Sequence, residues 1–135
     1  MITSLSHMTF AVKNLAKMGQ FLEDIFAAEQ AYASDDQEFS ISPERFYLIG
    51  EIWVAIMQAE DNIERSYNHI AFKISDDDFD MYEQRLIDHK IEMLPPRPRV
   101  KGEGRSLYFY DFDNHLFELH TGTLNERLAR YKLKK

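Results

Sequence analysis

Residues 6–12, SHMTFAV, return in outline as residues 68–74, NHIAFKI. Each copy is a short run of mainly apolar residues behind a polar residue and a histidine, which is typical of a β-strand. A stretch with apolar residues at three- and four-residue spacing follows each copy, from Leu15 to Phe26 and from Phe79 to Ile87. The repeat therefore predicts two similar halves, each opening with a strand and a helix.

Further strand patterns follow each predicted helix. They lie at residues 38–41, 45–49 and 52–57 in the first half and at 91–94, 106–110 and 116–120 in the second. Ser75 and Thr123, with acidic residues three positions on, are predicted N-caps. The patterns predict a single α+β domain of two paired βαβββ modules, at about residues 1–61 and 62–122, with a C-terminal helix at about 123–135.

The composition limits the classes of partner. Hydrophobic residues make up 44% of the 135 residues, which predicts a packed core. The net charge of −7 argues against nucleic acid and anionic membranes as partners, since both attract electropositive surfaces. The chain has no cysteine, no leader-like N-terminus and no apolar run of membrane-spanning length. We therefore expect a soluble cytoplasmic protein.

Two histidines occupy equivalent places in the repeat, His7 and His69, and Glu118 lies in the last strand pattern. If the halves pair by approximate symmetry, the histidines can approach one cavity. Two imidazoles and one carboxylate suit a divalent ion such as Mn²⁺ or Fe²⁺ and leave coordination positions open. A histidine in a strand is more often structural, so the spacing leaves both interpretations open. His120, on the same strand face as Glu118, is an alternative ligand or a partner of a ligand.

A basic segment stands out in this acidic chain: it holds Arg97, Arg99, Lys101 and Arg105 against one acid, Glu103. Together with Arg127 in the first turn of the last helix, it is a candidate site for a phosphate-like dianion. A solvated loop is the alternative. Ser106 and Tyr108 share one strand face and could add neutral hydrogen-bond donors.

Glu44 follows Pro43 between two strand patterns. A carboxylate in such a place is usually an exposed turn residue. It becomes a candidate general base only if the turn reaches the metal cavity.

Three segments resemble the fosfomycin resistance proteins of the vicinal oxygen chelate superfamily. They are YNHIAF at 67–72, GEGRSLYFYDFDNHLFELH at 102–120, and GTL at 122–124 with Arg127 and Leu128 behind it. The second segment is the most specific, and the likeness spans nearly the whole chain. The resemblance implies a vicinal oxygen chelate fold in a homodimer that exchanges its βαβββ modules.

The same resemblance implies the site residues. The family's Mn²⁺ ligands fall on His7 of one subunit and on His69 and Glu118 of the other. Positions that line its substrate cavity fall on Thr9, Trp53, Tyr67, Ser106, Tyr108 and Arg127. Where the family's transferases carry a lysine this chain has Pro98, so Arg99 or Lys101 is expected to substitute.

Glu44 favours the family's hydrolase branch, in which a carboxylate at this position is implied to activate water. The expected reaction is Mn²⁺-dependent attack of water on C1 of fosfomycin, with Tyr67 or Thr9 hydrogen-bonded to substrate oxygens. A fosfomycin transferase using glutathione or bacillithiol is the first alternative. A binding protein that sequesters the drug is the second, and a hydrolase of another epoxide or phosphonate is the third.

Overall fold

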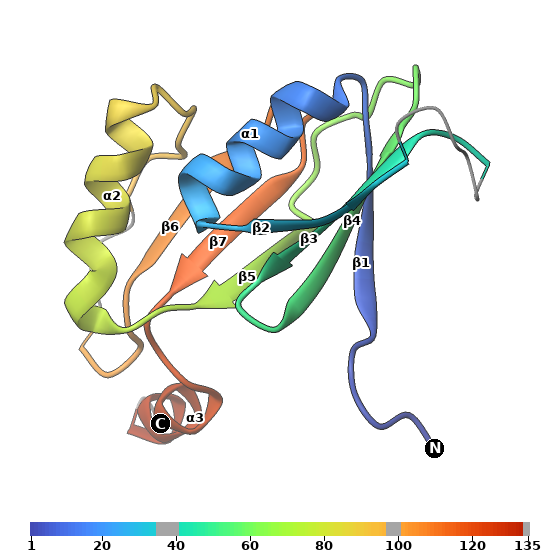
Figure 1. The fold of residues 1–135 in the computed structure, drawn as a ribbon. Helices are drawn as coiled ribbons and strands as arrows, with labels where there is room; N and C mark the ends of the chain where they lie inside the picture. Colours follow the sequence, from blue (N-terminus) through green and yellow to red (C-terminus); the bar gives the residue numbers. More distant parts are fainter. Residues whose placement is uncertain (35–40, 97–100, 134–135) are drawn as a thin grey trace. The chain divides into compact units, whose positions relative to one another are not determined.

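The computed structural model describes residues 1–34, 41–96 and 101–133. The chain divides into two compact units, Met1–Ile63 and Glu64–Lys135 (Figure 1). Each unit opens with a strand and a helix and continues into a sheet. The single-domain organisation and the module limits expected from the repeat stay predictions.

The first unit is a four-stranded sheet with one helix. Its elements are β1 (His7–Val12), α1 (Leu15–Phe26), β2 (Glu29–Ala33), β3 (Glu44–Ile49) and β4 (Ile52–Gln58). The strand order is β1-β4-β3-β2, with β1 parallel to β4 and the other pairs antiparallel. The Asn14 side chain caps α1 by accepting a 2.9 Å hydrogen bond from the Lys17 amide.

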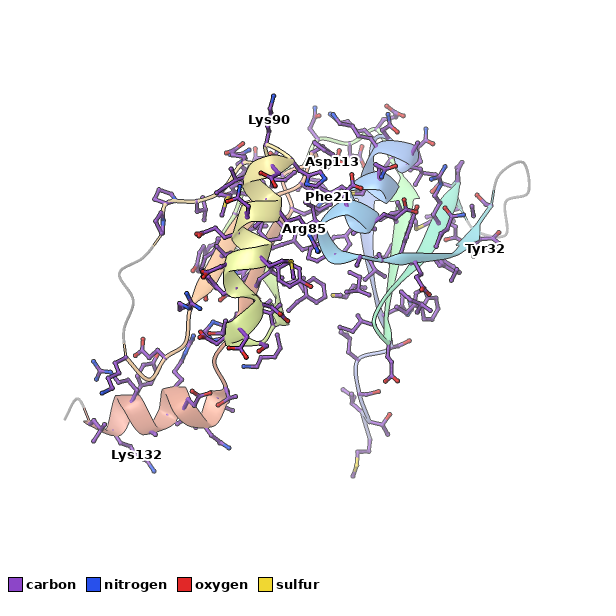
Figure 2. The ribbon with its side chains drawn as sticks, turned by 60° about the vertical axis from the view of Figure 1, so that its left-hand side comes forward. Phe21, Tyr32, Arg85, Lys90, Asp113 and Lys132 are labelled. Atoms are coloured by element: carbon purple, nitrogen blue, oxygen red, sulfur yellow. The ribbon has the colours of Figure 1, made fainter. Side chains whose placement is uncertain are left out.

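Helix α1 packs on β3 and β4 and covers one face of this sheet (Figure 1). Its apolar stripe, which includes Phe21 (Figure 2), is buried with Val12, Tyr47 and Val54. Burying each such side chain stabilises the fold by roughly 1.5–3 kcal/mol. Because neighbouring strand residues point to opposite faces, the positions between these core residues face away from α1.

The second unit repeats the plan with a three-stranded sheet. Its elements are β5 (His69–Lys73), the 3₁₀ helix η1 (Asp76–Asp78), α2 (Phe79–Asp88), β6 (Ser106–Tyr110), β7 (Leu116–His120) and α3 (Leu124–Leu133). The strand order is β5-β7-β6, with β5 parallel and β6 antiparallel to β7. The core buries Phe72, Phe79, Leu86, Leu107, Phe109, Phe117 and Leu119.

Both predicted N-caps are confirmed. The Ser75 hydroxyl accepts from the Asp77 amide at 3.3 Å and begins η1, and α2 follows it directly. The Thr123 hydroxyl accepts from the Glu126 amide at 3.1 Å and begins α3, on which Lys132 lies (Figure 2). No helix of the described residues is both long and apolar enough to span a bilayer.

Two strand predictions differ from the structure. The pattern at 38–41 lies mostly outside the described residues, and the strand between α1 and β3 is β2, an edge strand whose first three residues are exposed. Such a strand lacks the alternating apolar pattern that would have marked it. The pattern at 91–94 contributes an isolated bridge between Met93 and Phe109. Pro95 and Pro96 follow at once and cannot donate to a ladder.

We expect Gly104→Ala to destabilise the protein more than Gly50→Ala does. Both glycines have positive φ, +77° and +59°, where an L side chain is strained by roughly 1–2 kcal/mol. A Cβ on Gly104 would also lie 2.4 Å from the Gly122 backbone nitrogen, whereas no described atom lies within 4 Å of one on Gly50. Overpacking adds about 1–3 kcal/mol. Urea unfolding measures both free energies, and equal losses would contradict the expected clash.

Candidate functional site

One face of the second unit's sheet carries most of the predicted site residues. Tyr108 lies opposite Glu118 and Ser106 lies opposite His120 on the antiparallel strands β6 and β7. His69 begins the neighbouring strand β5, and its side chain reaches the same face. The predicted sharing of a face by Ser106 and Tyr108, and by Glu118 and His120, is therefore confirmed.

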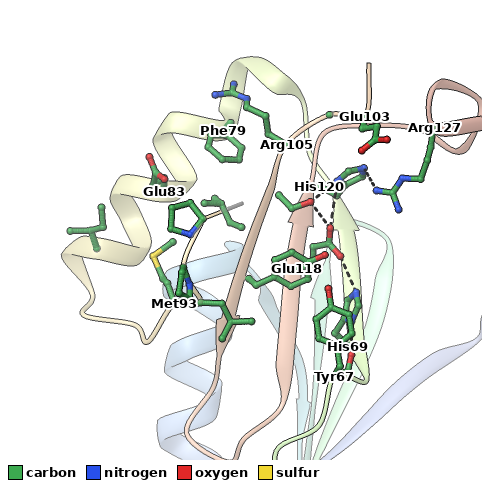
Figure 3. A pocket seen from close by; sticks show the side chains of 18 of the residues that line it. Tyr67, His69, Phe79, Glu83, Met93, Glu103, Arg105, Glu118, His120 and Arg127 are labelled. Carbon is green, nitrogen blue, oxygen red and sulfur yellow. Dashed lines mark hydrogen bonds and ion pairs between the residues drawn. The ribbon is translucent and has the colours of Figure 1, made fainter. Parts of the chain in front are cut away.

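His69 and Glu118 form the centre of this face. The His69 Nε2 lies 3.0 Å from the Glu118 Oε1, and its Nδ1 lies 2.7 Å from the Tyr67 carbonyl oxygen (Figure 3). A carbonyl only accepts, so Nδ1 carries a proton and Nε2 is the nitrogen that faces the carboxylate. Two electron-rich atoms this close require a proton or a cation beside them. The pair thus suits a divalent metal, and the Tyr67 carbonyl fixes the ring as partners of metal-binding histidines do.

The other oxygen of Glu118 has partners within the protein. The Ser106 hydroxyl donates to Glu118 Oε2 at 2.5 Å and lies 2.7 Å from His120 Nδ1. The Arg127 Nη2 lies 3.4 Å from His120 Nε2 (Figure 3). Burial lowers the pKa of His120, an effect that Glu118 opposes and Arg127 reinforces. His120 is therefore neutral at pH 7, and it lies where the sequence suggested a partner of a ligand.

Two tyrosines flank His69. The rings of Tyr67 and Tyr108 stack with centroids 6.0 Å apart, and each also meets the His69 ring edge-on. Burial raises the pKa of the Tyr108 hydroxyl, and a hydrogen bond with Tyr67 and the charge of Glu118 raise it further. Tyr108 is consequently protonated at neutral pH and can donate to an anionic ligand.

These side chains open onto a cavity of about 860 Å³ within the second unit (Figure 3). Its wall includes the polar residues Tyr67, His69, Glu83, Arg105, Ser106, Tyr108, Glu118, His120 and Arg127. Glu103 also lines it, with Oε1 buried and without a hydrogen-bond partner among the described residues. The sequence showed Glu103 only as the one acid of a basic segment.

The described cations of the basic segment have different surroundings. Arg105 donates to the Asp76 carboxylate at 3.0 Å and lies 4.1 Å over the Phe79 ring, so its charge is committed to the start of α2. Lys101 is exposed and is not part of the cavity wall. Arg97 and Arg99 lie outside the described residues. Among the described cations of the predicted dianion site, Arg127 is the one next to the metal-ligand candidates.

The first unit gathers its own predicted residues on the sheet face turned away from α1. His7 pairs with Trp53 across β1 and β4, their rings stack at 4.1 Å, and Thr9 lies one step along the same face. The Ser6 hydroxyl lies 2.9 Å from His7 Nδ1, which leaves Nε2 as the outward nitrogen. Trp53 Nε1 is buried without a hydrogen-bond partner among the described residues.

Glu44 lies in a strand and not in an exposed turn. It is the half-buried first residue of β3, where its amide donates to the Ser34 hydroxyl at 3.0 Å. In the register of the sheet, Glu44 and Ala11 both pair with Met57 on β4. Phe46 and Thr9 likewise both pair with Ala55. Strand alternation therefore puts the Glu44 side chain on the face that carries His7, Thr9 and Trp53.

The candidate metal ligands are divided between the two units. His7 belongs to the first, and His69 and Glu118 to the second. Within residues 1–34, 41–96 and 101–133, no three His, Asp or Glu side chains form a group that could hold a metal ion. The three-ligand set stays a prediction. The structure brings two of its members together, His69 and Glu118.

This fold and donor set correspond to one known class of protein. The model of the Glyoxalase/Bleomycin resistance protein/Dioxygenase superfamily matches residues 4–119.

Similar proteins narrow the class. The fosfomycin resistance protein FosX of Mesorhizobium japonicum is 65% identical over 96% of this chain and 94% of its own. A crystal structure of FosX from Listeria monocytogenes, with Mn(II) and 1S,2S-dihydroxypropylphosphonic acid bound, has a TM-score of 0.90 and 55% identity over 96% of this chain and 100% of that one. The metallothiol transferase FosB of Staphylococcus haemolyticus is 38% identical over 98% of this chain and 93% of its own. The chain therefore belongs to this superfamily and, within it, to the FosX fosfomycin resistance proteins.

Proposed function

We propose that this chain is an Mn(II)-dependent enzyme that inactivates fosfomycin by adding water to its epoxide. The observation that carries the proposal is the Nε2 of His69 held 3.0 Å from the buried Glu118 carboxylate on a cavity wall that also presents Tyr108 and Arg127. The bound molecule of the Listeria FosX structure is a phosphonate with two neighbouring hydroxyls, which is what water addition to such an epoxide produces.

The metal would be held by His7, His69 and Glu118. Mn(II) accepts imidazole and carboxylate ligands and keeps positions open. When bound, it would supply Lewis acidity at the oxygen of the strained ring. The FosX structures with Mn(II) and with Mn(II) and sulfate support the choice of this metal.

The protein's own groups would direct the attacking water. Glu44 accepts a proton from the water as its oxygen bonds to C1, and the C1–O bond of the epoxide breaks with its electron pair passing to the ring oxygen. That oxygen takes a proton from solvent water and Glu44 returns its proton to solvent, so that one water in all is added to give the diol. Tyr67 or Thr9 hydrogen-bonds to substrate oxygens and holds C1 in line with the water.

The phosphonate would be bound by Arg127 with Tyr108, beside Trp53. A guanidinium provides paired donors for a phosphonate, and protonated Tyr108 adds a neutral one. Arg99 or Lys101 would complete the charge balance.

We further propose a homodimer with shared sites. In this dimer each site would combine first-unit residues of one subunit with second-unit residues of the other. The first-unit residues are His7, Thr9, Glu44 and Trp53. Support comes from the division of the ligands between two compact units, each with its residues on a single sheet face. A cytoplasmic location is also proposed, and a chain without cysteine is consistent with it.

A thiol transferase is the second candidate, favoured by the 38% identity to FosB. The identity to FosB is lower than the 65% shared with FosX. Thiol transfer also does not need a general base such as Glu44. A binding protein that only sequesters the drug would need no such base either.

Phosphorus NMR of fosfomycin with the protein and Mn(II) tests the function. We expect catalytic conversion to the vicinal diol without any thiol, and no conversion after the metal is removed with EDTA. Conversion only with glutathione or bacillithiol would identify a transferase. Loss of one fosfomycin per protein, without turnover, would identify a binding protein.

A further inference from the structure

The hydrogen bonds beside Glu118 run in one direction when Arg127 donates to His120. Arginine only donates, so Arg127 Nη2 makes His120 Nε2 an acceptor. Because Nε2 accepts, the ring proton lies on Nδ1, 2.7 Å from the Ser106 oxygen. Ser106 in turn has one hydroxyl proton, and it is given to Glu118 Oε2. The four residues form an Arg127–Glu118 hydrogen-bond chain in which each group donates to the next.

This chain assigns the two oxygens of Glu118 different roles. Oε2 accepts from Ser106 and lies 3.4 Å from His120 Nδ1, and Oε1 faces His69 Nε2. Glu118 is 5% exposed, so its orientation is determined by these protein groups. A carboxylate held in this way presents one oxygen to a cation.

The backbone holds His120 in place. A Cβ on Gly122 would lie 2.7 Å from His120 Nε2, so the chain passes directly against the ring. Only glycine permits this approach. His120 therefore has a fixed ring plane as well as a fixed proton.

We infer that His120 is a positioning residue that orients Glu118 for the metal through Ser106 and orients Arg127 for the phosphonate through its other nitrogen. The inference rests on the proposed function for the identity of the two ligands. It also changes the expected role of Ser106: its proton is committed to Glu118, so Ser106 acts on the carboxylate and not as a donor to the phosphonate.

Two substitutions separate the two nitrogens of His120. His120→Gln places an amide near the position of Nε2, where its oxygen can accept from Arg127, and removes the donor to Ser106. His120→Asn places an amide near Nδ1, where its NH₂ can donate to Ser106, and removes the acceptor for Arg127. A group with no positioning role would not distinguish them.

We expect His120→Gln to raise the Mn(II) dissociation constant about 10–100-fold, the usual effect of losing a partner of a ligand, with a KM for fosfomycin within about threefold of wild type at saturating Mn(II). For His120→Asn we expect the reverse, with Mn(II) affinity within about threefold of wild type and KM raised about tenfold by the loss of one hydrogen bond to Arg127. The EPR signal of free Mn(II) gives the first constant without any turnover. Equal effects of both variants on both constants, or no effect, would overturn the inference.

A double-mutant cycle supplies a second criterion. If His120 acts on Glu118 through Ser106, then adding His120→Gln to Ser106→Ala changes Mn(II) affinity less than about twofold, whereas independent residues would multiply their effects. Should a histidine variant fail to fold, Ser106→Ala alone decides: weakened Mn(II) binding supports the chain and unchanged binding overturns it. If the two His120 variants differ in Mn(II) affinity as expected but the wild type does not turn over fosfomycin, only the proposed function is contradicted. If the wild type turns over fosfomycin but the two variants do not differ, only this inference is contradicted.

Discussion

Replacing Glu44 by glutamine should abolish most of the hydration of fosfomycin while leaving both ligands bound. Glutamine keeps the size of the side chain and cannot take a proton from water, so kcat should fall about 10²–10⁴-fold, the usual contribution of a general base. The Mn(II) dissociation constant and the affinity for fosfomycin should stay within about threefold of wild type, because the proposed ligands of both lie elsewhere.

Glu51→Gln is the matched control. Glu51 is an exposed carboxylate in the turn between β3 and β4 of the same unit, and its loss should leave kcat unchanged. Phosphorus NMR gives the rates of both variants. Unchanged turnover in Glu44→Gln would remove Glu44 from the mechanism, and equal losses in both variants would point to a general effect of charge.

The second large effect concerns the division of the metal site between subunits. His7→Ala and Glu118→Ala should each weaken Mn(II) binding and reduce activity by at least about 10³-fold, since the Lewis acid contributes several kcal/mol. Mixing the two inactive variants by joint refolding should restore activity. In a mixed dimer the His7→Ala subunit supplies His69 and Glu118, and the Glu118→Ala subunit supplies His7.

The restored level follows from the symmetry of a dimer. Half of the dimers are mixed and each has one complete site of two, so about a quarter of wild-type activity should return. A mixture of His69→Ala with Glu118→Ala is the control and should stay inactive, because both changes fall in the same half-site. Mixed dimers without activity would mean that each site is built within one chain.

Some of the fold could be predicted because its signals are local. The bounds of β6 and β7 agree with the strand patterns at 106–110 and 116–120, and the caps at Ser75 and Thr123 act over three residues. Alternation along a strand was enough to place Glu118 and His120 on one face. The edge strand β2 escaped prediction because a mostly exposed strand needs no apolar pattern.

The functional site shows the same limit to what the sequence can predict. The sequence indicated His69, Glu118, Ser106 and Arg127 as candidates, but it also grouped Arg105 with them. In the structure Arg105 is bound to Asp76 at the start of α2. A charge has many possible partners in the sequence, and packing selects one of them.

From the sequence alone we could predict the repeat, the strands β6 and β7, the shared faces of Ser106 with Tyr108 and of Glu118 with His120, and the family resemblance. All of these depend on residues a few positions apart or on recognisable motifs. The pairing of the strands, which puts Ser106 opposite His120 and Tyr108 opposite Glu118, is visible only in the folded chain. The direction of the hydrogen bonds from Arg127 to Glu118 follows from that pairing. It depends on distances between side chains far apart in sequence, which arise only when the backbone is folded.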